Sequence, residues 1–224
     1  ELIGGTANIY NAQLSVSGGS AATQFLISGT YRKETTVFPG DAHFNRGAVA
    51  ANITHRSEDE KFNLMFSANY TSDKNTLPGI DLTRQSYTLA PNAPALYDGA
   101  GNLNWENGSF ENPLSYLNGK YINTANTLLA NALLSYKLPG GFELRTSLGF
   151  SDSQLSEERS LPYTMYNPFY GLTSESSEMV LNDGKRRSWI IEPQLNWKKI
   201  WNNTEVNVLA GTTFQTQKQQ ALAL

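Results

Sequence analysis

The stretch at residues 62–71, Phe62-Asn63-Leu64-Met65-Phe66-Ser67-Ala68-Asn69-Tyr70-Thr71, alternates between two kinds of side chain. Successive side chains of a β-strand point to opposite faces of the sheet. The even-numbered residues here are aromatic or aliphatic, whereas most of the odd-numbered ones carry amides or hydroxyls. The pattern therefore predicts a strand with one face in an apolar medium and the other in a polar one.

Similar alternation recurs along the chain and predicts about eight strands, at residues 10–17, 24–32, 49–54, 62–71, 128–136, 142–151, 189–197 and 205–214. Every second connection is short, at Gly18, Ser57, Pro139 and Asn202, and the two longest are residues 72–124 and 156–185. A barrel with two different sides sorts its connections in this way. We therefore expect an all-β fold, an antiparallel transmembrane β-barrel segment with short turns on one side and long loops on the other.

Aromatic residues bracket the apolar face of three of these strands. An eight-residue interval spans roughly 26 Å along a strand, or about 20 Å along the membrane normal at a tilt near 40°. That height approaches the ~25 Å apolar band of outer-membrane barrels, which aromatic girdles flank. The predicted membrane girdle consists of Phe62 and Tyr70, Phe142 and Phe150, and Trp189 and Trp197.

Composition excludes several classes of protein. The 224 residues are 39% hydrophobic and have a mean hydropathy of −0.41, and they contain no apolar run of the ~18 residues that a spanning helix requires. The net charge is −3, and the one dense basic run, residues 185–187, is too short for a nucleic-acid groove. Cysteine is absent and residues 1–5 form no signal peptide. We expect both ends to be cuts in a longer polypeptide.

Residues with catalytic chemistry are sparse. The two histidines, His43 and His55, lie in no metal-binding motif, and the acid pairs 59–60 and 157–158 have the pattern of solvated charges. Residues 98–102 lack the spaced acids of a calcium loop and predict a plain turn. We expect no enzymatic activity, no metal and no cofactor.

The long loops hold more suggestive residues. Aromatic side chains among Asn, Asp and Ser can stack on sugars or anchor a peptide or protein. They can equally pack the loops together, and the sequence leaves the two roles open. The candidate residues for substrate or partner contact are Tyr97, Trp105, Phe110 and Tyr116 in the first loop, and Tyr163, Tyr166, Phe169 and Tyr170 in the second.

Several of these stretches carry a family likeness. Residues 13–20, QLSVSGGS, followed by 25–31, FLISGTY, resemble the first barrel hairpin of SusC/RagA-type TonB-dependent transporters of Bacteroidetes. Residues 44–46 with 52–54 are similar to the following strand, and the Asn-Pro motif at 112–117, NPLSYL, recurs in that family. The resemblance implies that residues 1–224 form an early part of a large barrel, without its plug and closing strands.

The same resemblance implies an outer-membrane location and a role in nutrient uptake. The expected partners are outer-membrane lipid, a surface SusD-like lipoprotein, a glycan or peptide ligand, and TonB through a segment absent here. Two alternatives stay open from the residues alone. One is a complete small eight-stranded outer-membrane barrel with an adhesive or structural role, and the other is a soluble carbohydrate-binding β-sandwich.

Overall fold

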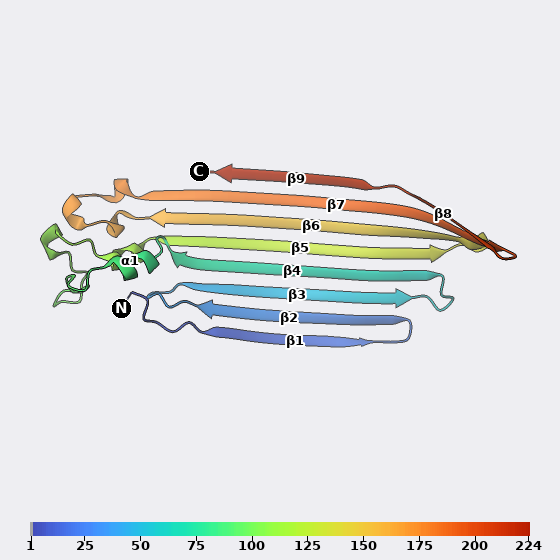
Figure 1. The fold of residues 1–224 in the computed structure, drawn as a ribbon, viewed down its shortest axis with the longest axis horizontal. Helices are drawn as coiled ribbons and strands as arrows, with labels where there is room; N and C mark the ends of the chain where they lie inside the picture. Colours follow the sequence, from blue (N-terminus) through green and yellow to red (C-terminus); the bar gives the residue numbers. More distant parts are fainter. Residues whose placement is uncertain (1) are drawn as a thin grey trace.

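A computed structural model describes residues 2–224, which form a single antiparallel sheet one layer thick (Figure 1). The first eight strands pair in sequence order, and the ninth lies beside the seventh. Their bounds are β1 Ile9–Gly19, β2 Thr23–Thr35, β3 His43–Arg56, β4 Phe62–Pro78, β5 Lys120–Lys137, β6 Phe142–Leu161, β7 Glu178–Trp201, β8 Thr204–Gly211 and β9 Phe214–Ala223.

The pairing register keeps apolar residues together from strand to strand. On β6, for example, Leu148 lies opposite Ala132 of β5 on one side and Ile191 of β7 on the other. Because a shift of one residue would turn a whole strand over, this register gives the sheet two different faces. We call them the apolar face, which includes Leu148, and the polar face.

No second layer covers either face. The accessible surface is 14787 Å², against roughly 10,000 Å² for a compact protein of this mass. In the described chain β1 does not pair with β8 or β9, so the sheet stays open. A sandwich needs a second packed sheet and a small barrel needs closure, so the fold favours neither alternative. The fold is that of a β-barrel segment, as the sequence predicts.

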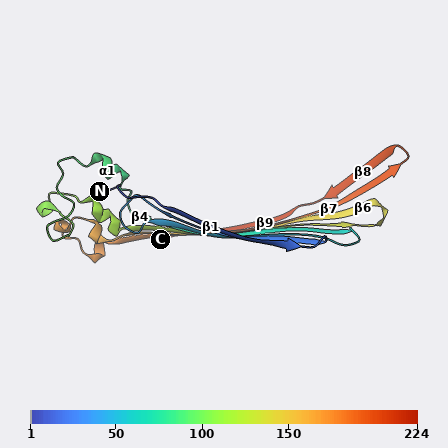
Figure 2. The ribbon, with the colours of Figure 1, turned by 90° about the horizontal axis from the view of Figure 1, so that it is seen from below.

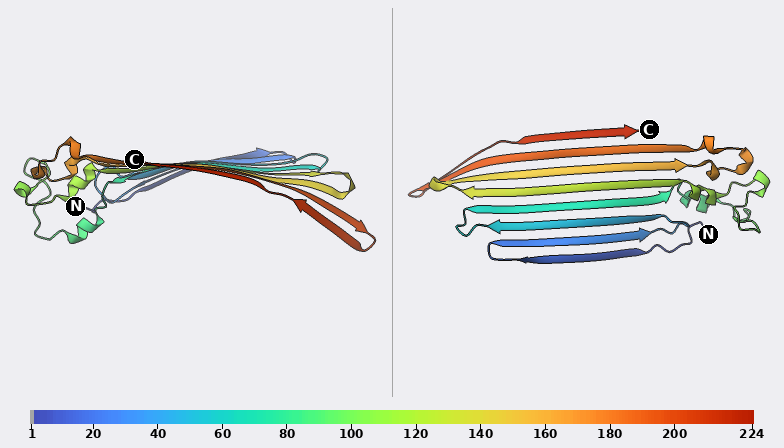
Figure 3. Two further views of the ribbon diagram at one scale, coloured as in Figure 1. Left: turned by 90° about the horizontal axis from the view of Figure 1, so that it is seen from above. Right: turned by 180° about the vertical axis from the view of Figure 1, so that it is seen from behind.

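The strands extend further toward the loops than their alternation predicts. Connections expected at residues 72–124 and 156–185 narrow to 79–119 and 162–177, because β4, β5, β6 and β7 all continue beyond the alternating stretches. Figures 2 and 3 show both long loops at one end of the sheet and the tight turns at the other. The predicted sorting of connections by length is therefore confirmed.

Short helices occur within the loops. Among residues 2–224 the one α-helix, α1, spans Thr83–Thr88 in the first long loop. The 3₁₀ helices are η1 Glu106–Gly108, η2 Pro113–Asn118, η3 Pro139–Gly141, η4 Tyr163–Met165, η5 Pro168–Tyr170 and η6 Ser174–Ser176. No helix among residues 2–224 is long and apolar enough to cross a membrane.

The ninth strand arises from an interruption of the predicted eighth. Residues 205–214 were expected to form one strand, but β8 ends at Gly211 and β9 begins at Phe214. Pro193 lies opposite this gap, and Thr212 N–H donates to its carbonyl at 3.1 Å. A proline within a strand removes one ladder hydrogen bond, which accounts for the interruption at this position.

Candidate functional site

The predicted girdle residues lie together on the apolar face. Phe150 is directly opposite Trp189, and Phe142 is opposite Trp197 with ring centroids 6.0 Å apart. The indole N–H of Trp197 donates to the carbonyl oxygen of Gly140 at 3.1 Å. An aromatic ring that lies on the apolar face while its polar atom bonds to a turn is the arrangement expected at a membrane–water interface.

The third predicted pair continues the two aromatic rows with a shift of two residues toward the loops, because its partners Tyr136 and Leu128 lie opposite Leu144 and Asp152 of β6. On β4, Phe62 lies opposite Tyr136 of β5, and Tyr70 lies opposite Leu128. Between the two rows the apolar face carries small and aliphatic residues, including Ala68 opposite Ala130. We call this part of the sheet, from the Phe62–Phe142–Trp197 row to the Tyr70–Phe150–Trp189 row, the apolar band.

The polar face carries a set of cross-strand hydrogen bonds. Arg46 lies opposite Asp73, and its guanidinium donates to both carboxylate oxygens at 2.7 Å. Nearer the centre of the sheet, the hydroxyls of Ser151 and Ser188 are 2.7 Å apart. Paired and hydrogen-bonded polar groups of this kind suit the water-filled interior of a barrel.

The buried residues of the chain lie mainly in the long loops. Leu2, Leu96, Phe110 and Leu114 form one apolar cluster, and Met165 of the second loop is only 2% exposed. The cluster therefore gives the first loop, residues 79–119, a small core of its own, and the second loop, residues 162–177, is joined to it by hydrogen bonds. We call the two packed loops the loop platform.

Two Asn-Pro dipeptides hold the first loop in place. Asn112 and Asn167 are 1% and 0% exposed, and each precedes the proline that opens a 3₁₀ helix. The carboxamide of Asn112 accepts from Leu114 N–H at 3.0 Å and donates to the carbonyls of Leu96 and Asn104 at 2.6 and 3.0 Å. A buried amide with these partners is fully engaged.

The second dipeptide joins one loop to the other. The carboxamide of Asn167 accepts from Phe169 N–H at 3.1 Å and donates toward the carbonyls of Gly108 and Phe110 at 3.2 and 3.4 Å. Ser115 adds a link in the opposite direction, because its hydroxyl is 2.7 Å from the carbonyl oxygen of Met165. The sequence analysis did not single out Asn167; the repeat of the Asn-Pro dipeptide in both loops was the available signal.

The structure divides the eight predicted contact residues into three groups. Phe110 is 9% exposed and belongs to the apolar cluster, while Trp105 and Tyr116 are half-buried. The other five keep large exposed areas. They are Tyr97, Tyr163, Tyr166, Phe169 and Tyr170, of which Phe169 is the most open at 63%.

Two titratable groups in the loops are tuned by hydrogen bonds. Backbone N–H groups of Asn102 and Ala100 donate to the Asp98 carboxylate at 2.8 and 2.9 Å and lower its pKa. The hydroxyl of Tyr170 donates to Glu111, which raises the pKa of Tyr170. The Asp98 oxygens thus close a local turn, which agrees with the expectation of a plain turn.

The structure shows no grouping that would bind a metal. Within residues 2–224, no three His, Cys, Asp or Glu side chains are close enough to hold an ion. His43 Nδ1 contacts the carbonyl oxygen of Asp41, and His55 Nδ1 is 2.7 Å from the Thr23 hydroxyl. Both rings therefore have local hydrogen-bond partners.

No protein-family model matches the chain. A curated relative is the TonB-dependent receptor P3 of Formosa agariphila, which is 24% identical over 234 residues, or 97% of this chain. The chain spans 22% of the length of that receptor.

Solved structures show the same architecture. A structure of the RagAB peptide transporter superposes with a TM-score of 0.72 and 14% identity, over 98% of this chain and 25% of the matched chain. The ferripyoverdine receptor of the outer membrane of Pseudomonas aeruginosa gives a TM-score of 0.55 and 14% identity, over 96% of this chain and 27% of its own.

These comparisons relate the fold of the chain first to a class of proteins and then to a subgroup within that class. The chain has the fold of a barrel segment of TonB-dependent receptors, a class of outer-membrane proteins. Within that class, the curated relative and the RagAB match confirm the resemblance to SusC/RagA-type receptors. The relatives are receptors and transporters rather than enzymes.

Proposed function

We propose that this chain forms barrel wall and outer loops of a TonB-dependent transporter that imports glycan or peptide nutrients together with a surface lipoprotein. The observation that carries the proposal is the two-sided sheet, with an apolar band on one face and hydrogen-bonded polar groups on the other. The separation of short and long connections also gives the orientation of the sheet across the membrane, because outer-membrane barrels have short periplasmic turns and longer extracellular loops. The loop platform then lies outside the cell.

The wall and the platform have separate roles in this mechanism. The six girdle residues, Phe62, Tyr70, Phe142, Phe150, Trp189 and Trp197, set the height of the barrel in the bilayer. The polar face offers a hydrated surface along which a ligand passes once a plug moves. Energy coupling to TonB belongs to parts of the protein outside this segment.

Ligand or lipoprotein contact falls to the exposed aromatics of the platform. Phe169 and Tyr170 are 63% and 60% exposed and lie on η5. They follow directly after Asn167, whose hydrogen bonds to the first loop we call the Asn167 clamp. A rigid base under two exposed rings lowers the entropy lost on binding. Tyr97, Tyr163 and Tyr166 extend the same contact set, and the half-buried Trp105 and Tyr116 support it. Phe110 is left out, because it packs in the core of the platform.

The proposal is tested in a strain that lacks the whole receptor and is complemented with variants of the full-length protein. We expect deletion to abolish growth on one class of nutrient, either oligosaccharides or peptides, and the wild-type gene to restore it. A Phe169→Ala/Tyr170→Ala variant should lower uptake or release the lipoprotein in a pull-down. Trp201→Ala is the control, since Trp201 is a 48% exposed aromatic at the end of β7, on the short-turn side of the sheet away from the platform.

Two results would contradict the proposal. One is a deletion strain that takes up both oligosaccharides and peptides as well as the wild type. The other is recovery of the receptor from the soluble fraction rather than from outer membranes. The pull-down separates the two contact roles, because a ligand site leaves lipoprotein recovery unchanged.

A further inference from the structure

The loop platform carries the negative charge of the chain. Residues 79–119 and 162–177 contain five acids and one cation, Arg84, which gives them a net charge of −4, whereas the whole chain has −3. Among residues 2–224 none of the five acids forms an ion pair. They are all exposed: Asp81, Asp98, Glu106, Glu111 and Glu175. The platform therefore presents uncompensated negative charge to the solvent.

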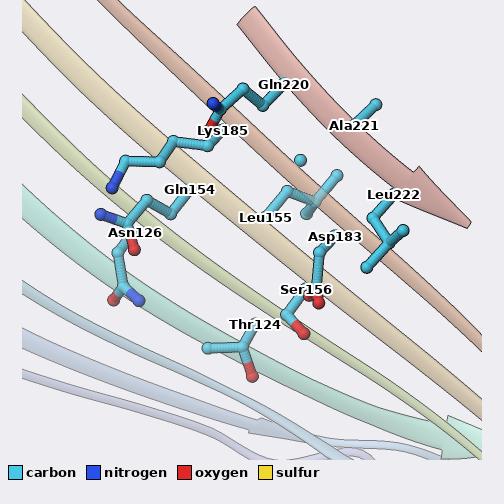
Figure 4. A pocket seen from close by; sticks show the side chains of 11 residues that line it. Thr124, Asn126, Gln154, Leu155, Ser156, Asp183, Lys185, Gln220, Ala221 and Leu222 are labelled. Carbon is cyan, nitrogen blue, oxygen red and sulfur yellow. The ribbon is translucent and has the colours of Figure 1, made fainter.

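The wall below the platform has no such excess. In the groove across β5, β6, β7 and β9, the acid Asp183 and the cation Lys185 line the same pocket (Figure 4). Two cations lie at the foot of the platform. Lys120 pairs with Asp41 at 3.2 Å, and Arg159 donates to a carbonyl of the first loop at 3.2 Å. In the described chain neither cation forms an ion pair with an acid of the platform.

The two most exposed contact rings of the platform are held in place from below. Phe169 and Tyr170 belong to η5, and the Asn167 clamp fixes this helix to the Gly108 carbonyl at 3.2 Å. The Gly108 backbone, with a φ of +93°, passes so close to Phe169 that a Cβ there would lie 2.9 Å from its Cγ atom. Only glycine fits at this position, and the ring rests directly on the first loop.

Two of the acids border these rings. Glu111 accepts from the Tyr170 hydroxyl and, at 3.4 Å, from the Asn167 amide. Glu106 begins η1, which ends in the glycine beneath the other ring, and accepts from the Asn104 amide at 3.2 Å. These donors are uncharged, so they orient the carboxylates without neutralising them. An aromatic face beside a charged carboxylate is the chemistry that binds an ammonium or guanidinium group.

We propose that Phe169 and Tyr170, together with Glu106 and Glu111, form a capture site for peptides that carry lysine or arginine. A cationic side chain stacks on a ring within about 6 Å of its centroid and pairs with the carboxylate beside it. A neutral glycan gains only the stacking, and an acidic glycan or peptide is repelled by the net charge of the platform. The inference rests on the proposed function and selects peptides over glycans as the nutrient.

The test uses outer-membrane vesicles that contain the full-length receptor. The probe is the amidated peptide Gly-Arg-Gly-Arg-Gly with an N-terminal dansyl group, and vesicles from the deletion strain give the background. Glu106→Gln/Glu111→Gln keeps the hydrogen-bond acceptors but removes two charges. It should bind the probe roughly fivefold more weakly, as expected for two exposed charge pairs.

The matched control, Glu58→Gln/Glu60→Gln, removes the same two charges from the turn between β3 and β4, at the opposite end of the sheet (Figure 3). This control should bind like the wild type. Raising the salt concentration to about 0.5 M should weaken binding to the wild type and have little effect on the Glu106→Gln/Glu111→Gln variant, because salt screens charges at exposed sites.

Four results would overturn the inference. The first is equal affinity of the wild type and the Glu106→Gln/Glu111→Gln variant for the probe, and the second is tighter wild-type binding of Gly-Glu-Gly-Glu-Gly. Equal binding of a glucosamine tetramer would assign the site to cationic sugars instead of peptides. Loss of the lipoprotein from pull-downs of the variant would assign the two charges to that partner. Growth of the deletion strain on peptides and oligosaccharides is measured separately, so failure of the transport proposal is distinguishable.

Discussion

Pro193 and Thr212 form half of a hydrogen-bonded pair: Thr212 N–H donates to Pro193 O at 3.1 Å, and Pro193 has no N–H to return. The register on both sides of the gap is the same, because Gln194 lies opposite Gly211 and Ile191 opposite Phe214. β8 and β9 are therefore one strand with a single missing bond. The interruption does not shift any side chain to the other face.

Replacing the proline should close this gap. We expect Pro193→Val to restore the missing bond, worth about 1 kcal/mol, and to slow hydrogen exchange in residues 204–223 of the full-length protein. Exchange is followed by mass spectrometry in detergent. Ile191→Val is the control, because it changes the same face two residues away without adding a donor. Unchanged exchange in Pro193→Val would show that another feature interrupts the strand.

The clamp made by Asn167 should control the order of the loop platform. Asn167→Ala removes the amide that bonds the Gly108 and Phe110 carbonyls and leaves buried groups unpaired, a loss of about 1–3 kcal/mol. Limited proteolysis should then cut residues 104–118 faster while the barrel stays intact. Asn92→Ala, at an exposed site in the same loop, should leave the cleavage rate unchanged. Equal cleavage in both variants would contradict a clamp.

Neighbouring positions on β4 should respond in opposite ways to a charge. Ala68 belongs to the apolar face and Asn69 to the polar face. An arginine facing lipid at the middle of a bilayer costs about 2–4 kcal/mol, so Ala68→Arg should reduce the amount of folded receptor in outer membranes. Asn69→Arg should reach wild-type levels on immunoblots. Similar levels for both variants would argue against lipid on the apolar face.

The short turn between β3 and β4 should lose stability in acid. Hydrogen bonds from Ser57 Oγ and from Lys61 N–H lower the pKa of Asp59 to about 2, from 3.8. A lowered folded-state pKa stabilises above the unfolded-state value and ceases to do so as the pH falls through the folded-state value.

We therefore expect the difference in thermal midpoint between the wild type and Asp59→Ala to be constant from pH 4 to 7. It should shrink as the pH falls from about 4 to 2. Glu58→Ala is the control for the loss of one negative charge from the same turn. A difference that stays unchanged down to pH 2 would contradict the role given to the Asp59 carboxylate.

Alternation predicted the strands only where the two faces meet different media. Residues 62–71 of β4 alternate and were predicted, whereas Ser72–Pro78 continue the same strand without a signal, because Asp73, Lys74 and Asn75 are all polar. A strand with water on both sides has no reason to alternate. The predicted loops were consequently too long at both ends.

The loop platform illustrates a second limit of prediction from the sequence. Aromatic residues in a loop have the same sequence appearance whether they pack or stay exposed, so Phe110 and Phe169 could not be told apart before the fold was known. The contact between the two loops depends on Asn167, whose partners Gly108 and Phe110 are more than fifty residues away. Only the repeated Asn-Pro dipeptide carried a local hint.

Site-directed spin labelling along β4 tests the central claim most directly. Single cysteines at positions 64–69 of the full-length receptor, labelled with a nitroxide in native outer-membrane vesicles, report access to oxygen in lipid and to a nickel chelate in water. The account predicts period-two behaviour, with labels at Leu64, Phe66 and Ala68 accessible to oxygen and those at Met65, Ser67 and Asn69 to nickel. Nickel access at all six positions would contradict a lipid-facing wall.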